Sequence, residues 1–110
     1  MLLIKLFYTP LHHAASNSQN EAIKILLQYG ADPNKDIFVK SGFDYPDTPI
    51  NWIVNEGNTE GFEIIEDYML KNELSLDYSI LLDVAKNADK KNQDLISKIQ
   101  EKFKYIFIMK

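Results

Sequence analysis

Two adjacent histidines, His12 and His13, are the side chains with which this chain could bind a metal or transfer protons. Consecutive residues of a helix point about 100° apart, so the two rings are poorly placed to share one metal ion. The chain has no Cys, which excludes a disulfide framework, a thiolate nucleophile and a zinc-finger pattern. A small metal-dependent enzyme using His12 and His13 is therefore a minor alternative, and we expect both residues to be structural, with His13 in a packing position.

The acidic residues offer no better candidate for catalysis. Asp77 and Asp83 lie six residues apart, and Glu63, Glu66 and Asp67 fall in a segment with helical periodicity. Neither group comes with a nucleophile or an oxyanion donor, and the sequence lacks a glycine-rich phosphate loop and a calcium-loop pattern. We therefore predict a protein that is not an enzyme and that uses no metal or cofactor.

Composition and charge restrict the kinds of partner. All 12 basic residues are Lys, the formal net charge is −4, and the longest basic run is Lys90-Lys91. We expect no binding to nucleic acid or to an anionic membrane, because both rely on clustered positive charge. The chain also lacks an apolar run of about 18 residues, the length of a membrane-spanning helix, so we predict an intracellular, cytoplasmic protein.

The string Thr9-Pro10-Leu11-His12-His13-Ala14-Ala15 has the residue types of a helix start. A Thr hydroxyl can cap the helix, and Pro suits the first helical position, where no amide donor is needed. The Ala pair leaves room for a second helix to pack closely. That second helix is predicted from about Asn20 to Tyr29, because apolar residues recur at helical spacing and Gly30 can end it in a left-handed conformation.

This string resembles the ankyrin repeat, whose signature is T-P-L-H-x-A on a period of about 33 residues. The similarity continues without a gap to Asn34, and Ser18 stands where the family usually has Gly between the two helices. The resemblance implies an all-α fold in which antiparallel helix pairs stack into an α solenoid. It also implies that His12 is hydrogen-bonded within the turn beside Thr9.

The start of the string recurs further along the chain. Thr48-Pro49-Ile50 lies 39 residues after Thr9 (48 − 9 = 39), six more than the family period. A fainter third unit is indicated by Ser79, Leu81 and Val84-Ala85, which occupy matching positions. The predicted helix pairs are residues 10–17 with 20–29, 49–56 with 59–70, and 80–87 with 92–105.

We predict one domain over residues 1–110. Repeat 1 covers about 8–34, a finger covers 35–47, repeat 2 covers about 48–76, and a degenerate repeat 3 with a C-terminal cap covers about 77–110. Three units are about the minimum that buries a continuous core in such an array. Asn72 is expected to hold the left-handed position that ends the second pair, as Gly30 does in the first.

The six extra residues fall between Asn34 and Thr48, where the family has its projecting β-hairpin finger. Ile37-Phe38-Val39 is a β-prone run, Ser41-Gly42 suits a turn, and Phe43-x-Tyr45 alternates as a second strand would. The segment therefore predicts a long, apolar β-hairpin finger. Its apolar side chains either anchor a partner or fold back onto Trp52, and the sequence leaves both outcomes open.

The resemblance implies binding of another protein on the concave side of the stack, by a module without catalysis. The implied partner-binding residues lie on the finger, beside the helix starts and on the first helices: Tyr8, Ser16, Asn17, Ile37, Phe38, Val39, Phe43, Tyr45, Asp47, Asn55 and Glu56. The excess of Lys, Ile and Asn over Arg suggests an AT-rich coding sequence. With the minimal repeat count, this favours a host-directed protein of a microbe or virus, and delivery into a host cell would then follow.

Two further possibilities remain open from the sequence. The abrupt apolar start, residues 1–8, and the fading third repeat also fit a degenerate remnant or fragment of a larger ankyrin-repeat protein. The same apolar N-terminal edge could mediate self-association.

Overall fold

The computed structural model describes residues 8–39 and 44–109, with side chains for 8–39 and 44–105. The described residues form six helices and no strand: α2 (Pro10–Ser16), α3 (Asn20–Gln28), α4 (Pro49–Asn55), α5 (Thr59–Lys71), α6 (Tyr78–Lys86) and α7 (Gln93–Met109). The predicted all-α class is confirmed. None of the described helices combines the length and the apolar character that a bilayer crossing requires.

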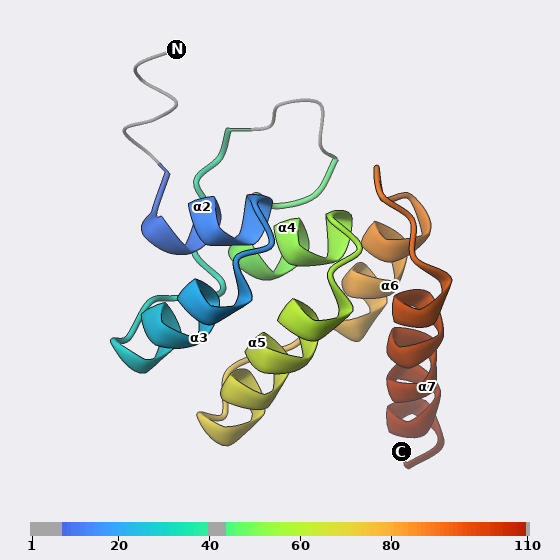
Figure 1. The fold of residues 1–110 in the computed structure, drawn as a ribbon. Coiled ribbons are helices and arrows are strands. Elements are labelled where there is room, and N and C mark those ends of the chain that lie inside the picture. Colours follow the sequence, from blue (N-terminus) through green and yellow to red (C-terminus); the bar gives the residue numbers. More distant parts are fainter. Residues whose placement is uncertain (1–7, 40–43, 110) are drawn as a thin grey trace.

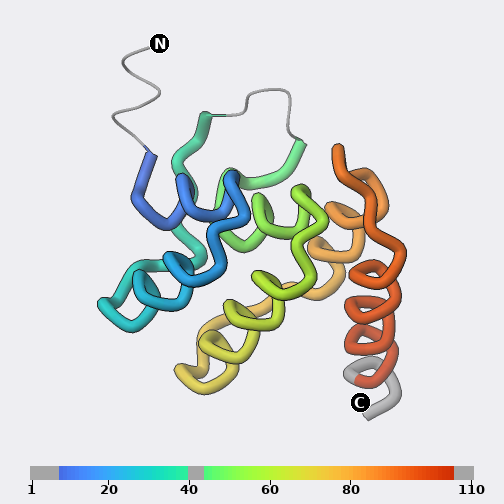
Figure 2. Tube along the Cα trace, viewed as in Figure 1, coloured from blue at the N-terminus to red at the C-terminus, as the bar shows by residue number. Residues whose placement is uncertain are grey.

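The helices form three pairs that stand side by side (Figure 1). Within the pairs α2 packs on α3, α4 on α5 and α6 on α7, and between pairs α2 contacts α4, α4 contacts α6 and α3 contacts α5. The short first helices therefore make one layer and the second helices another. Figure 2 shows that pairs adjacent in the sequence are also adjacent in space. This arrangement is the predicted helix-turn-helix stack.

One apolar core runs between the two layers. Each first helix buries three residues at equivalent positions, namely Leu11, Ala14 and Ala15 in α2, Ile50, Ile53 and Val54 in α4, and Leu81, Val84 and Ala85 in α6. The second helices complete the core with Ile23, Leu27, Phe62, Ile65, Met69, Leu95 and Ile99. The register predicted for the faint third unit is therefore confirmed by burial.

The first two helix pairs start as predicted, whereas the third starts earlier. Thr9 and Thr48 each cap a helix through the side-chain oxygen, which accepts the N–H three residues on, with Pro at the first helical position. In the third pair the cap is Asp77, whose carboxylate accepts the N–H groups of Ser79 and Ile80. The prediction that this helix starts at Ile80 was wrong, because the carboxylate of Asp77, three residues upstream, satisfies the first free donors and the helix starts at Tyr78.

The turns that end the helices use left-handed residues. Gly30 and Gly57 have φ of 90° and 66°. The second pair ends at Glu73, with φ of 55°, and not at the predicted Asn72, whose φ is −101°. The reason is that α5 is one residue longer than predicted, so Asn72 becomes the last near-helical residue and the left-handed position moves one residue on.

The β-hairpin finger is not present in the described part of the connection between α3 and α4, and that prediction was wrong. Phe38 has φ of 55°, which interrupts the extended run predicted for Ile37-Phe38-Val39. Asp36 Oδ1 accepts the N–H groups of Phe38 (2.8 Å) and Asp47 (3.1 Å), two donors that a strand ladder would need. The Ile37 N–H does donate to the backbone O of Asp47 at 3.3 Å, but the Asp36 side chain takes the neighbouring donors, so the described residues form no strand ladder. The predicted turn at Ser41-Gly42 lies outside the described residues.

Candidate protein-interaction face

His12 is fully buried and joins α2 to the connection that precedes α4. Its Nδ1 lies 2.7 Å from Thr9 Oγ1, and its Nε2 lies 2.7 Å from the backbone O of Asp47. A carbonyl oxygen only accepts, so Nε2 carries the proton and donates, while Nδ1 accepts from the Thr9 hydroxyl. Both ring nitrogens are engaged within the chain, and the predicted structural role of His12 is confirmed.

The environment of this imidazole favours its neutral form. Burial lowers the pKa of His12 from its ordinary 6.5, and the hydrogen bond to the backbone O of Asp47 opposes this only in part. The ring of Trp52 packs edge-on against His12, with ring centroids 5.2 Å apart, and Tyr8 packs against Trp52 at the same distance. Trp52 Nε1 also donates to Asp47 Oδ1 at 3.2 Å. These contacts hold the half-buried Trp52 and Tyr8 in fixed positions.

His13 is exposed, which corrects the expectation that it occupies a packing position. The equivalent residue one unit later, Trp52, packs on the His12 ring of the preceding unit, whereas the described residues place no preceding unit beside His13. With His12 buried and His13 exposed, the two rings do not form one site. Among the described residues no group of three His, Cys, Asp or Glu side chains could hold a metal ion.

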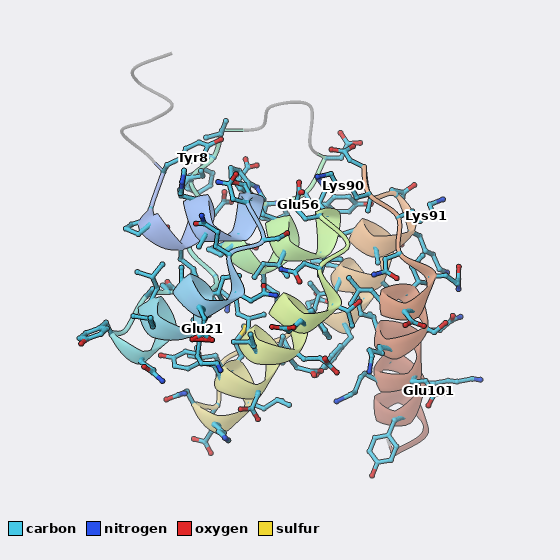
Figure 3. All side chains as sticks on the ribbon, in the orientation of Figure 1. Tyr8, Glu21, Glu56, Lys90, Lys91 and Glu101 are labelled. Atoms are coloured by element: carbon cyan, nitrogen blue, oxygen red, sulfur yellow. The ribbon has the colours of Figure 1, made fainter. Side chains whose placement is uncertain are left out.

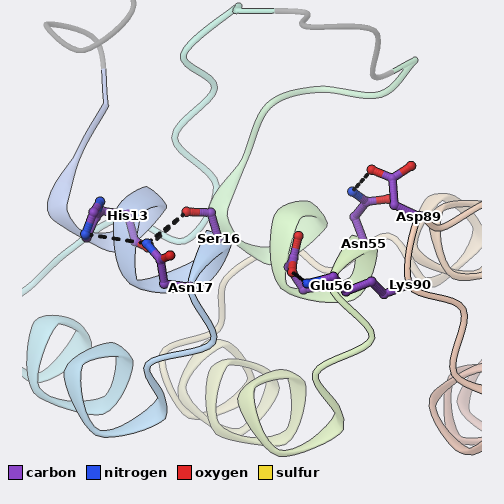
Figure 4. A network of polar contacts seen from close by, with 7 residues as sticks. All are labelled: His13, Ser16, Asn17, Asn55, Glu56, Asp89 and Lys90. Carbon is purple, nitrogen blue, oxygen red and sulfur yellow. Dashed lines mark hydrogen bonds and ion pairs between the residues drawn. The ribbon is translucent and has the colours of Figure 1, made fainter.

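A row of polar side chains follows the ends of α2 and α4 and the turn between α6 and α7 (Figure 4). At the end of α2, Ser16 Oγ and Asn17 Nδ2 donate to the backbone O of His13 at 3.0 and 2.9 Å. Asn17 is exposed and Ser16 half-buried. Both side chains are therefore held by their own helix end while they remain accessible.

The second part of the row connects neighbouring units. Asn55 Nδ2 donates to Asp89 Oδ2 at 3.2 Å, and Asn55 Oδ1 accepts the N–H of Asp89 at 3.1 Å. Glu56 forms an ion pair with Lys90 at 3.0 Å. Asn55 and Glu56, predicted as binding residues, thus also tie the second unit to the third. Asp89 and Lys90 were not predicted for this face, although both follow their partners by 34 residues (89 − 55 = 34), close to the repeat period.

The residues predicted for the finger differ in how far they are exposed. Ile37 and Asp47 are buried, with 7% and 1% of their surface exposed, and so are inaccessible to a partner in this conformation. Val39 and Tyr45 are half-buried, and Tyr45 packs against the core. Phe38 is 73% exposed. The predicted residue Phe43 lies outside the described residues.

Comparison with known proteins agrees with the geometry of the first helix pair. A profile of the ankyrin-repeat family matches residues 7–36. These residues are therefore similar to one ankyrin repeat. Searches among curated proteins and among solved structures give no significant match. The two later helix pairs continue the layout of this ankyrin repeat, which makes the chain consistent with a short repeat array.

The ankyrin repeat indicates a protein–protein interaction module, and repeats of this family are typically not enzymes. The family match ends before α4, so it covers the Ser16 and Asn17 part of the polar row. Asn55, Glu56, Asp89 and Lys90 are assigned to the same face by position and contacts alone.

Proposed function

We propose that this chain binds a partner protein, without catalysis, through the face formed by the ends of its first helices. This first-helix face consists of Tyr8, His13, Ser16, Asn17, Trp52, Asn55 and Glu56. The observation that carries the proposal is that its accessible side chains are already held in place by contacts within the chain. Binding by such side chains loses less conformational entropy than binding by free ones.

The chemistry of the face supports a protein as the partner. Tyr8 and Trp52 are large, half-buried and rigid, and such aromatic residues contribute strongly to protein interfaces. Glu56 and Lys90 neutralise one another, and amide and hydroxyl groups supply the remaining polar contacts. The exposed carboxylate of Asp89, which is bonded to the neutral Asn55, leaves the surface negative, and with the aromatic anchors this favours a folded protein or peptide over a polyanion. Figure 3 shows Tyr8, Glu56 and Lys90 on the same side of the molecule.

The geometry of the hydroxyl group on this face supports a function without catalysis. The Ser16 hydroxyl donates to the backbone O of His13 at 3.0 Å, and the polar contact of the His13 ring is with Asn17 Nδ2 at 3.5 Å. An activated nucleophile needs its hydroxyl aimed at a basic nitrogen. The further proposal that the partner is a protein of a host organism rests on the composition of the chain alone.

Site-specific photocrosslinking tests the proposed face. A photoreactive amino acid replaces Asn17 on the first-helix face, and a matched control replaces Glu101, which is exposed on α7 (Figure 3). In host-cell extract we expect a discrete adduct from position 17 alone. The captured protein, once purified, is expected to bind the unmodified chain in calorimetry. Equal adducts from both positions, or no binding by the purified protein, would contradict the proposal.

A further inference from the structure

One side of α3 carries an apolar stripe that the fold leaves open. The stripe consists of Ala22, Ile25, Leu26 and Tyr29, which are spaced as one face of a helix. Tyr29 is 87% exposed and Ile25 is 48% exposed, while Ala22 and Leu26 are partly buried against the core. Large apolar residues exposed together on a helix indicate a contact surface.

The second unit shows what this stripe contacts in a repeat array. The equivalent residues of α5, 39 positions later, are Gly61, Ile64, Ile65 and Tyr68. A Cβ at Gly61 would lie 3.0 Å from Asn20 Oδ1 of α3, and Tyr68 lines one groove together with Leu27 and Gln28 of α3. In α5 these positions therefore face the preceding second helix.

The third unit follows the same rule. The equivalent positions of α7 include Lys98 and Lys102, whose ammonium groups lie 3.1 and 3.4 Å from carboxylate oxygens of Glu63 and Glu66 on α5. In both later units these positions thus face the second helix of the preceding unit. The α3 stripe, at the same positions, is therefore suited to contact another second helix. Within the described residues no helix precedes α3 in this layer, and Figure 1 shows α3 at the end of the stack.

The other end of the stack is a poor match for the stripe. The side of α7 that would face a following unit carries exposed Gln93, Ser97, Gln100 and Glu101. Polar outer faces are what terminal units of a solenoid need. A head-to-tail contact between copies would bury these polar groups against Ile25 and Tyr29 without hydrogen-bond partners, which is unfavourable.

We propose that the α3 stripe is the interface of a symmetric dimer of this chain. A two-fold axis between residues 25 and 26 makes two α3 helices antiparallel. Tyr29 of each copy then lies opposite Ala22 of the other, and Ile25 lies opposite Leu26. The largest side chain of the stripe thus meets the smallest, which lets the two faces interdigitate. All four residues of the stripe are uncharged, and the nearby Glu21 is paired with Lys24 at 3.7 Å.

Sedimentation velocity from micromolar to millimolar concentration tests this inference. We expect a monomer–dimer equilibrium in which Ile25→Lys or Tyr29→Ala raises the dissociation constant at least about tenfold, since Ile25 lies beside the proposed axis and Tyr29 is the largest apolar side chain of the stripe. Tyr105→Ala, at a tyrosine 65% exposed on α7, is the matched control and should leave the equilibrium unchanged. Because the Tyr29 side chain is so exposed, its truncation should leave the fold of the monomer intact. A weaker dimer of this variant would therefore report the loss of the interface.

Disulfide trapping gives a second readout, because the natural chain has no Cys. Ile25→Cys should form a covalent dimer on mild oxidation much faster than Tyr105→Cys. A chain that stays monomeric at every concentration, or equal trapping at the two positions, overturns the proposal. A monomer with nuclear Overhauser contacts between Tyr29 and residues 1–7 also overturns it and assigns the stripe to the chain's own N-terminal segment.

Discussion

His12 is the residue whose role is most fully determined by its contacts. Its ring accepts from Thr9 and donates to Asp47, and its own backbone N–H donates to the Thr9 side chain. The resemblance to the ankyrin repeat implied this role, since the family signature places the ring beside the Thr9 cap. It could not predict that the second acceptor is the carbonyl of Asp47, since that contact spans 35 residues.

Removal of this imidazole should destabilise the fold. His12→Ala leaves the Thr9 hydroxyl and the Asp47 carbonyl without their partner, which we expect to cost about 1–3 kcal/mol of unfolding free energy. His13→Ala, at the exposed neighbour, should change it by less than about 0.5 kcal/mol. Urea denaturation followed by circular dichroism measures both. An unchanged midpoint for His12→Ala would return His12 to the list of functional candidates.

The lowered pKa of His12 also predicts a dependence of stability on pH. The unfolded chain takes up a proton near pH 6.5, whereas the folded chain resists protonation until its lower pKa is reached. Stability is therefore complete above about pH 6.5 and declines as the pH falls below that value. His12→Asn, which copies Asn51 of the second unit, should reduce this decline. Denaturation at about pH 7.5 and about pH 5.5 gives the comparison. If the natural chain and His12→Asn lose the same amount of unfolding free energy at the lower pH, His12 is excluded as the source of the pH dependence.

Ser18 and Gly57 provide a matched pair of backbone tests. Ser18 has φ of 52° at the turn between α2 and α3, so Ser18→Gly should stabilise the chain by about 0.5–1 kcal/mol. Gly57 has φ of 66° at the equivalent turn, and a Cβ there would meet the backbone O of Lys90. Gly57→Ala should therefore destabilise the chain by more than about 1 kcal/mol. Thermal melting measures both variants. If the two substitutions shift the melting temperature in the same direction, the left-handed conformation assigned to these two turns is contradicted.

At the scale of elements, prediction succeeded where the signal is local. The Thr-Pro starts, the helical spacing and the Gly ends lie within a few residues of the helices they define, and α2 to α5 begin where predicted. The start of α6 was missed because Asp77 competes with Ser79 as the cap. The finger failed because an isolated β-prone run does not show that the Asp36 side chain will take its amide donors.

A buried carboxylate on α5 joins the second helix pair to both helices of the third. Glu66 is only 7% exposed; it accepts the hydroxyl of Tyr78 at 2.7 Å and lies 3.4 Å from the ammonium group of Lys102. Tyr78→Phe leaves this carboxylate with one partner fewer and should cost about 1.5–3 kcal/mol, the range for a hydrogen bond to a charged group. Hydrogen exchange should show faster opening of α6 and of α7, which packs on it. Tyr105→Phe is the control, and equal effects of both variants would argue against this role of Glu66.

At the scale of the whole molecule, the three pairs should unfold together. Leu27 is 2% exposed, so Leu27→Ala should cost about 2–5 kcal/mol and lower the stability of every pair, because each pair buries its apolar face only against its neighbours. Circular dichroism and the fluorescence of Trp52, which lies between the first two units, should give the same transition. Separate transitions, or strong binding of an apolar dye by the native chain, would favour a degenerate remnant.

The candidate face was predictable only in part, because its residues come from separate units. Ser16 and Asn17 follow from the family pattern, whereas Asp89 and Lys90 reach the face through a turn that the faint third repeat did not reveal. Phe38 was predicted for the right segment but for the wrong conformation. The sequence thus predicted the position of a residue within one repeat more easily than a contact between two repeats.

Hydrogen–deuterium exchange of the complex with the captured partner tests the central claim most directly. We expect slower exchange at the end of α2, the end of α4 and the turn before α7, which carry the first-helix face and its ion pair to Lys90. The outer side of α7, with Gln100 and Glu101, should exchange as in the free chain. Protection confined to α7 or to α3, with the ends of α2 and α4 unaffected, would contradict the proposal that the first-helix face binds the partner.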